Sequence, residues 1–206
     1  MRTTRRDLFC GALAGGTAAL GVALSPQAAL ADPTALLRGA TNDGQLLERL
    51  LGFEQLEVFA YGHVERASVL PAHARVTVAH FLRQERRHLE LLAAAVIRHG
   101  ASAPTAPESL SAADRELAAL GVSGRLDHVG DASSAVRLLI GLETAAETVY
   151  YRAIERLSSV TLVGVAAGIL GCEAQHWSGL SALLHLGDPG IAVPHAFAPL
   201  VGQFSA

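Results

Sequence analysis

The chain has 206 residues, of which 50% are hydrophobic, enough for one ordinary domain with a sizeable core. Acidic residues outnumber basic ones by 19 to 16, a formal net charge of −3, which argues against a nucleic-acid-binding surface. Of the two cysteines, Cys10 precedes the fold expected below, so Cys172 is left without an intrachain disulfide partner.

Residues 1–31 have the layout of a secretory signal peptide. The stretch Arg5-Arg6-Asp7-Leu8-Phe9 precedes an apolar run, residues 11–24, and Ala29-Leu30-Ala31 offers a small-x-small cleavage site. The run of 14 residues is too short for a comfortable membrane span. The paired arginines resemble a twin-arginine signal, so we expect export to the periplasm, the cell envelope or the extracellular space. A retained N-terminal anchor is the alternative.

After a linker of residues 32–42, four segments of about 25 residues show the hydrophobic periodicity of α-helices, and there is almost no strand signal. Gly100 and Gly187 are the expected stop signals of the second and fourth helices. A tail of residues 188–206 should be irregular. The predicted helices cover residues 43–67, 71–99, 133–157 and 161–186.

The lengths of the connections predict how these helices pair. A few residues join the first helix to the second and the third to the fourth, so each pair should form an antiparallel hairpin. About 33 residues, 101–133, separate the hairpins, and a short helix is expected around residues 112–120. The sequence therefore predicts an all-α four-helix bundle over residues 43–187, made of two antiparallel hairpins joined by a long crossover.

A Glu-x-x-His motif occurs twice, and the two copies lie 88 residues apart. The first copy is Glu85 with His88, and the second is Glu173 with His176. Residues three apart share one face of a helix, so each copy could present both side chains to one ligand. A single copy is more often a solvated surface pair. The second copy, at a matched position, favours a binding site.

The first and third helices carry a second repeated pair, a glutamate followed seven residues later by a tyrosine. Glu54 with Tyr61 and Glu143 with Tyr150 lie 89 residues apart. The chain is therefore interpreted as a duplicated hairpin. Each half contributes Glu, Tyr and then Glu-x-x-His.

Each of the four repeated glutamates interrupts an apolar stripe that should face the core of the bundle. Isolated carboxylates in such an interior are costly and would protonate rather than stay charged. Two divalent cations would balance four negative charges, and one imidazole for each metal would complete the coordination. The pattern predicts a dinuclear metal centre, and ligands of this kind suit iron or manganese.

Two further glutamates complicate the assignment. Glu57 and Glu147 lie one turn beyond Glu54 and Glu143 and could partly face inward. The repeat favours Glu54 and Glu143, with Glu147 as the stronger rival. The alternative for Glu147 is a residue at the rim of the bundle, paired with an arginine.

The complete pattern resembles the ferritin-like superfamily, in particular exported ferritin-like domain proteins with twin-arginine signals. The resemblance extends from residue 43 to about residue 200 and includes the ending Pro194-His195-Ala196-Phe197. It implies that Glu85 and Glu173 bridge two metal ions. The complete set of implied metal ligands is Glu54, Glu85, His88, Glu143, Glu173 and His176.

The resemblance also implies roles for the tyrosines and a function. Tyr61 and Tyr150 would lie beside the ligands, where they could hydrogen-bond to them or take part in redox steps, with core packing as the alternative. We expect an exported monomer or homodimer that holds two iron (or manganese) ions and performs redox chemistry on iron, dioxygen or peroxide. The alternative is a non-enzymatic ferritin-like module that binds metal or a partner.

The apolar stretch of residues 160–172 opens the fourth helix and contains three glycines, Gly164, Gly168 and Gly171. We expect this stretch to be buried core. The glycines should then permit close helix approach rather than line a cofactor channel. Cys172, beside Glu173, is expected to be an ordinary packed cysteine.

Overall fold

The structure is a computed structural model that describes residues 31–186. The predicted signal peptide, apart from Ala31, and the tail of residues 188–206 lie outside the described residues. The described part has no strand and contains two 3-10 helices, η1 (Pro33–Leu37) and η2 (Leu126–His128). Its α-helices are α1 (Asp43–Arg66), α2 (Ala72–Arg98), α3 (Leu110–Ala119), α4 (Ala132–Arg156) and α5 (Val160–Leu184).

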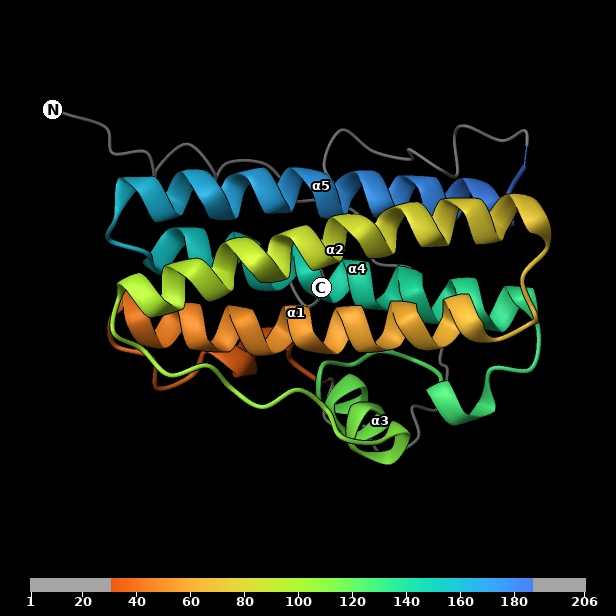
Figure 1. Cartoon of the computed structure of the whole chain (residues 1–206), viewed down its shortest axis with the longest axis horizontal. Helices are drawn as coiled ribbons and strands as arrows, with labels where there is room; N and C mark the ends of the chain where they lie inside the picture. Colours follow the sequence, from red (N-terminus) through yellow and green to blue (C-terminus); the bar gives the residue numbers. More distant parts are fainter. Residues whose placement is uncertain (1–30, 187–206) are drawn as a thin grey trace, which may run out of the picture.

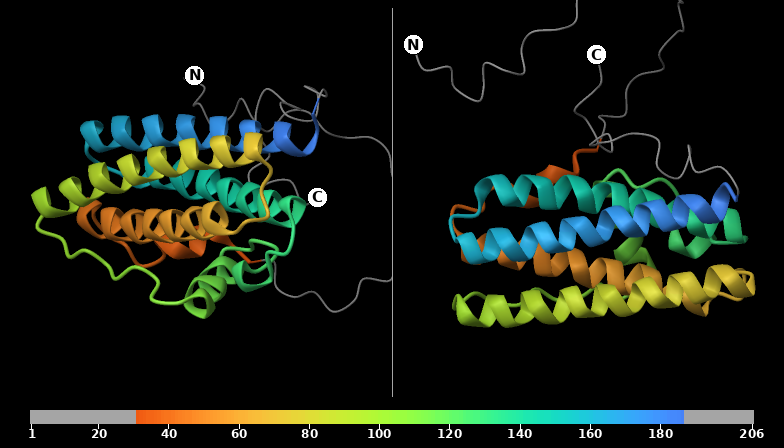
Figure 2. Two further views of the ribbon diagram at one scale, coloured as in Figure 1. Left: turned by 45° about the vertical axis from the view of Figure 1, so that its right-hand side comes forward. Right: turned by 90° about the horizontal axis from the view of Figure 1, so that it is seen from above.

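The bundle is formed by the long helices α1, α2, α4 and α5, which lie side by side (Figures 1 and 2). The antiparallel hairpin α1–α2 packs along the antiparallel hairpin α4–α5, and most contacts between helices lie within the hairpins. Residues 99–131 connect the hairpins along the length of the bundle and carry α3, which lies against α1. The predicted all-α four-helix bundle with a long crossover is confirmed. Among the described helices, there is none with the length and hydropathy of a membrane-spanning segment.

The helices begin and end within about two residues of the predicted bounds, because their caps are local in sequence. The Asn42 side chain accepts a hydrogen bond of 2.9 Å from the backbone N–H of Gln45 at the start of α1. Gly100 ends α2 in the left-handed region, with a φ of 63° that disfavours other residues. Asp131 and Ser134 form a capping box at the start of α4.

Polar contacts join the two hairpins at one end of the bundle. The Asp43 carboxylate, at the start of α1, accepts hydrogen bonds of 2.9 Å from the backbone N–H groups of Ser158 and Ser159. Arg156, at the end of α4, donates 2.8 Å to the carbonyl of Leu37 in η1. These bonds fix the relative position of α1 and α4, which each contribute one glutamate to the site described below.

The expectation that residues 160–172 are buried core is wrong for one face of α5. Val160 is 86% exposed, and Gly164, Gly168 and Gly171 are exposed as well. A Cβ atom added at any of these glycines would meet no atom within 4 Å, so they do not permit close helix approach. The periodicity of an almost wholly apolar segment cannot indicate which face meets a neighbour, because every face reads alike.

Candidate metal centre

Six side chains meet in the interior of the bundle, and each long helix supplies at least one. The four glutamates are completely buried, His176 is 1% exposed and His88 is 7% exposed. All six residues predicted from the sequence are thus brought together. They are Glu54 on α1, Glu85 and His88 on α2, Glu143 on α4, and Glu173 and His176 on α5.

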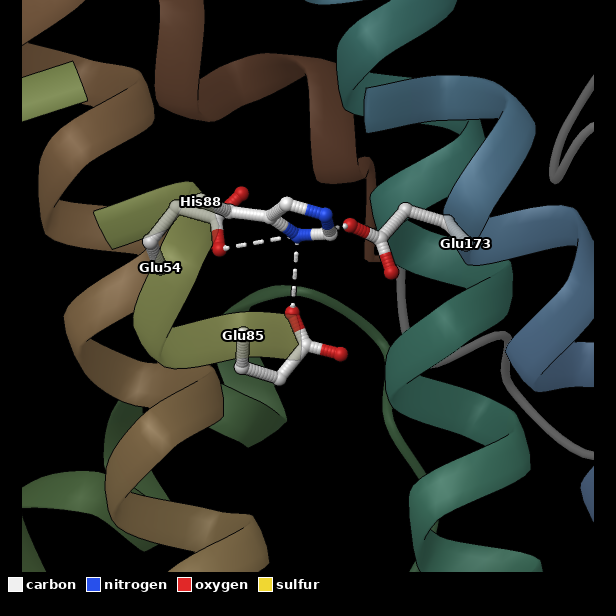
Figure 3. A group of neighbouring side chains, drawn as sticks. All are labelled: Glu54, Glu85, His88 and Glu173. Carbon is white, nitrogen blue, oxygen red and sulfur yellow. Dashed lines mark hydrogen bonds and ion pairs between the residues drawn. The ribbon is translucent and has the colours of Figure 1, made fainter. Parts of the chain in front are cut away.

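Three carboxylates converge on the imidazole of His88 (Figure 3). Its Nδ1 lies 3.0 Å from an oxygen of Glu173, 3.1 Å from Glu85 and 3.7 Å from Glu54. One ring nitrogen carries at most one proton, so it cannot donate to all three oxygens at once. The convergence is the arrangement that ligand atoms adopt around a shared cation.

A matching group surrounds His176. Its Nδ1 lies 2.7 Å from an oxygen of Glu85, 3.1 Å from Glu173 and 3.8 Å from Glu143. Within each of the two groups, one ligand atom from every member lies within 4.8 Å of the others. Glu85 and Glu173 belong to both groups, so the geometry permits these two carboxylates to be shared between two cations.

The carboxylates keep unused hydrogen-bonding capacity in the interior. Among the described residues, one buried oxygen of each of the four glutamates has no hydrogen-bond partner. The 2.7 Å approach of His176 Nδ1 to Glu85 Oε1 is an ion-pair contact without hydrogen-bond geometry. Buried acceptors without partners cost free energy. A cation bound among these oxygens would compensate that cost, and carboxylate oxygens are suitable ligands for one. The atoms concerned are Oε2 of Glu54, Oε1 of Glu85, Oε2 of Glu143 and Oε1 of Glu173.

Two tyrosines hold the remaining oxygens of the glutamates on α1 and α4. The Tyr61 hydroxyl donates to Oε1 of Glu143, and the Tyr150 hydroxyl donates to Oε1 of Glu54. Burial and the nearby carboxylates raise the pKa of both phenols well above the usual value, so both remain protonated donors. Each tyrosine therefore orients a glutamate of the other hairpin. A redox role for them stays a prediction.

The carboxyl groups around the imidazoles differ in their pKa values, so some are charged and others are neutral. Burial would lower the pKa of His88, but the neighbouring side chains of Cys172, Glu173 and Glu85 raise it to about 12. Burial would raise the pKa of Glu173, but the two neighbouring imidazoles, His176 and then His88, lower it to about 2. In contrast, burial and then Glu173 raise the pKa of Glu54 well above its usual range. Cations entering the site would displace these protons.

Glu57 and Glu147 are buried as well, although neither belongs to the groups around the two imidazoles. Glu57 is completely buried, and neither of its oxygens has a hydrogen-bond partner among the described residues. Glu147 is only 5% exposed, and no ion pair joins it to an arginine in the part of the chain described, so the alternative of an arginine-paired residue at the rim finds no support. Burial and then Glu173 raise the pKa of Glu147 to about 7.

Two residues that sequence reasoning did not single out complete the surroundings of His176. Its Nε2 lies 3.0 Å from Oε1 of Gln84 on α2 and 3.4 Å from Sγ of Cys172. The Phe81 ring lies against the imidazole, with ring centroids 4.3 Å apart. Gln84 and Phe81 meet His176 only because α2 and α5 are neighbours. Phe81 lies four residues before Glu85 on the apolar stripe of α2, so periodicity places it on this face, but nothing in the sequence identifies its contact, or that of Gln84, with His176.

The fold and the site together define a class of protein, a four-helix bundle with a buried glutamate–histidine cluster that could hold metal ions. The chain matches the family model of the ferritin-like domain over residues 42–186 and belongs to that family. The predicted ferritin-like resemblance is confirmed to this extent. Comparison with curated proteins and with solved structures gave no significant match.

Proposed function

We propose that the chain binds two iron or manganese ions and performs redox chemistry on ferrous iron, dioxygen or peroxide. The observation that carries this proposal is the pair of glutamate–histidine groups that share Glu85 and Glu173. Oxygen ligands with one imidazole for each ion suit iron and manganese better than metals that prefer thiolates. When bound, such ions supply reversible electron transfer at a small oxygen species.

The protein residues have separate tasks in this proposal. Glu54 and Glu143 would each hold one ion, while Glu85 and Glu173, which belong to both groups, would be shared between the two ions. Tyr150 and Tyr61 keep the first two carboxylates oriented through their hydroxyl groups. Since the ligands are buried, the bundle excludes bulk water and strengthens every charge interaction in the site.

Export through the twin-arginine pathway is part of the same proposal. The support is the arrangement of residues 1–31, in which paired arginines precede an apolar run and a small-x-small sequence. Replacing Arg5 and Arg6 by lysine should retain the protein in the cytoplasm of its own host. Fractionation and immunoblotting measure this, and undiminished export of the variant would contradict the assignment.

Metal titration tests the binding proposal. Metal-free protein titrated anaerobically with Fe²⁺ or Mn²⁺ should bind two ions per chain, measured by calorimetry and elemental analysis. The double variant Glu85→Gln, Glu173→Gln should lose both ions, because both carboxylates are shared. Glu90→Gln is the matched control on α2, since Glu90 is exposed and, among the described residues, its ion pair is with Arg87. Wild type that binds neither metal would overturn the proposal.

Turnover separates the redox proposal from a module that only binds metal or a partner. The loaded wild-type protein should oxidise Fe²⁺ or consume peroxide over many cycles, and the double variant should not. Optical spectroscopy and an oxygen or peroxide electrode follow the reaction. Stable binding of two ions without any turnover would favour the non-enzymatic alternative.

A further inference from the structure

We infer that the groove between α2 and α5 is the route by which small neutral oxidants, dioxygen or hydrogen peroxide, reach the centre. This inference rests on the proposed function. The groove has a volume of about 420 Å³, and its lining includes His88 and Cys172 together with Gly164 and Gly168. It therefore connects the surface of the bundle to an imidazole of the candidate metal centre.

The exposure of the candidate ligands points to the same opening. Five of the six are between 0 and 1% exposed, and His88, at 7%, is the one that lines the groove. Two other cavities of similar volume lie elsewhere on the described bundle. Neither is lined by any of the six residues, so they do not reach the centre.

The groove exists because α2 and α5 belong to different hairpins and contact each other much less than α4 and α5 do. The α5 wall carries the side chains of Val165, Ile169 and Cys172, and Gly164 and Gly168 leave gaps between them. An added Cβ at either glycine would meet no atom within 4 Å. A glycine inside a helix is unfavourable, and packing does not require either of these glycines. Both leave the α5 wall without a bulky side chain at these positions, which keeps the opening wide.

The lining also selects the kind of molecule that can pass. Leu91 and Ile169 give the groove apolar walls, and no carboxylate lines it. Arg87, at the groove, is paired with Glu90 at 2.9 Å. Walls without negative charge offer nothing to a hydrated cation, while dioxygen and hydrogen peroxide are small and neutral enough to pass.

The test fills the groove from α5. Gly168→Phe places a ring in the opening, and Gly168→Ala adds only a methyl group. Ala167→Phe is the matched control, because Ala167 is an exposed neighbour on α5 that does not line the groove. Each variant should fold, since the positions are exposed, and calorimetry should give the same number of bound metal ions as in wild type.

Two readouts follow access without measuring turnover. The first is alkylation of Cys172 in the metal-free full chain by N-methylmaleimide, resolved by peptide mass spectrometry. The second is the association rate of nitric oxide, a probe of the size of dioxygen, with the ferrous-loaded protein. Gly168→Phe should slow both at least about tenfold, and Gly168→Ala and Ala167→Phe should leave both within about twofold of wild type.

Each outcome decides between the two ideas. Slower alkylation with unchanged nitric oxide association in Gly168→Phe would overturn the inference and leave the metal centre intact. Equal slowing by Ala167→Phe would also overturn it, because the effect would not depend on the groove. Wild-type protein that binds no metal would instead overturn the proposed function. The two failures therefore give different results.

Discussion

Buried charge is the dominant feature at the scale of single residues. The interior contains six completely or almost completely buried glutamates, Glu54, Glu57, Glu85, Glu143, Glu147 and Glu173, and two imidazoles. Only four of these glutamates converge on an imidazole nitrogen, and Glu57 and Glu147 do not. This difference leads to a prediction for Glu54 and Glu57, which lie one turn apart on α1.

Glu54→Gln should reduce the metal content or weaken binding at one ion, whereas Glu57→Gln should still bind two ions per chain. The physical reason is that Glu54 approaches His88 Nδ1, while Glu57 lies outside both groups. The two variants remove the same charge from the same helix, so each serves as control for the other. Calorimetric titration measures the difference, and greater metal loss in Glu57→Gln would contradict the assignment of ligands.

The tyrosines allow a second prediction at this scale. Tyr150→Phe removes the donor to Oε1 of Glu54, so metal affinity should fall by about 10- to 100-fold. Tyr151→Phe is the control, because Tyr151 is 40% exposed. Competition with a chromophoric chelator gives the affinities. Equal affinities in the two variants would show that the buried hydroxyl only fills space.

At the scale of the helix, α5 contains glycines of two kinds. Gly168 faces open space, whereas a Cβ added at Gly179 would lie 2.7 Å from the ring of Phe81. That ring packs on the imidazole of His176, so the absent side chain at Gly179 makes room for a residue that positions the site. The helix is therefore constrained by packing at one glycine and by access at the other.

Gly168→Ala should stabilise the protein against unfolding by roughly 1 kcal/mol, the difference in helix propensity between the two residues. Gly179→Ala should not gain this stability, because Phe81 must move, and the displaced ring should alter the surroundings of His176. Chemical denaturation of both metal-free variants measures the difference in free energy of unfolding. Equal stabilisation by the two substitutions would contradict the packing described for α5.

The repeats explain how much of the helical arrangement the sequence could predict. Offsets of 88 and 89 residues placed Glu85 with Glu173 and Glu54 with Glu143 at equivalent positions of two hairpins. Three-residue spacing then placed each histidine beside its glutamate. Glu57 and Glu147 have no counterpart in the other half, since Ala146 and Val58 occupy those positions, and their burial became clear only from the packed helices.

Contacts between helices that involve residues outside the repeated motifs were beyond prediction from one sequence. The approach of Gln84 to His176 and the opening beside Gly168 depend on the separation of α2 and α5. No local pattern encodes that distance. The apolar character of residues 160–172 even suggested the opposite, a wholly buried segment.

At the scale of the whole molecule, protons and metal ions compete for the same interior groups. The raised pKa values of Glu54 and Glu143 mean that the folded state keeps protons that the unfolded state has lost above pH 4.5. His88, with a pKa of about 12, likewise stays protonated where the unfolded chain is neutral, above pH 6.5. Both effects make the metal-free fold less stable as the pH rises.

The melting temperature of metal-free protein should therefore fall between about pH 5 and pH 8. Glu173 acts in the opposite sense only at low pH, because the stability from its lowered pKa, about 2, is lost as the pH falls from 4.5 toward that value. The stabilisation by added Mn²⁺ should grow over the same interval, since deprotonated ligands bind metal better. Differential scanning calorimetry checks both trends, and a metal effect independent of pH would contradict the linkage.

The most direct measurement is anomalous X-ray diffraction from crystals of the iron- or manganese-loaded protein, recorded at the absorption edge of the metal. We expect two peaks in the bundle interior, one beside Nδ1 of His88 and one beside Nδ1 of His176, with Glu85 and Glu173 contacting both. Peaks confined to the surface, or a fully loaded crystal without density between these two carboxylates, would contradict it.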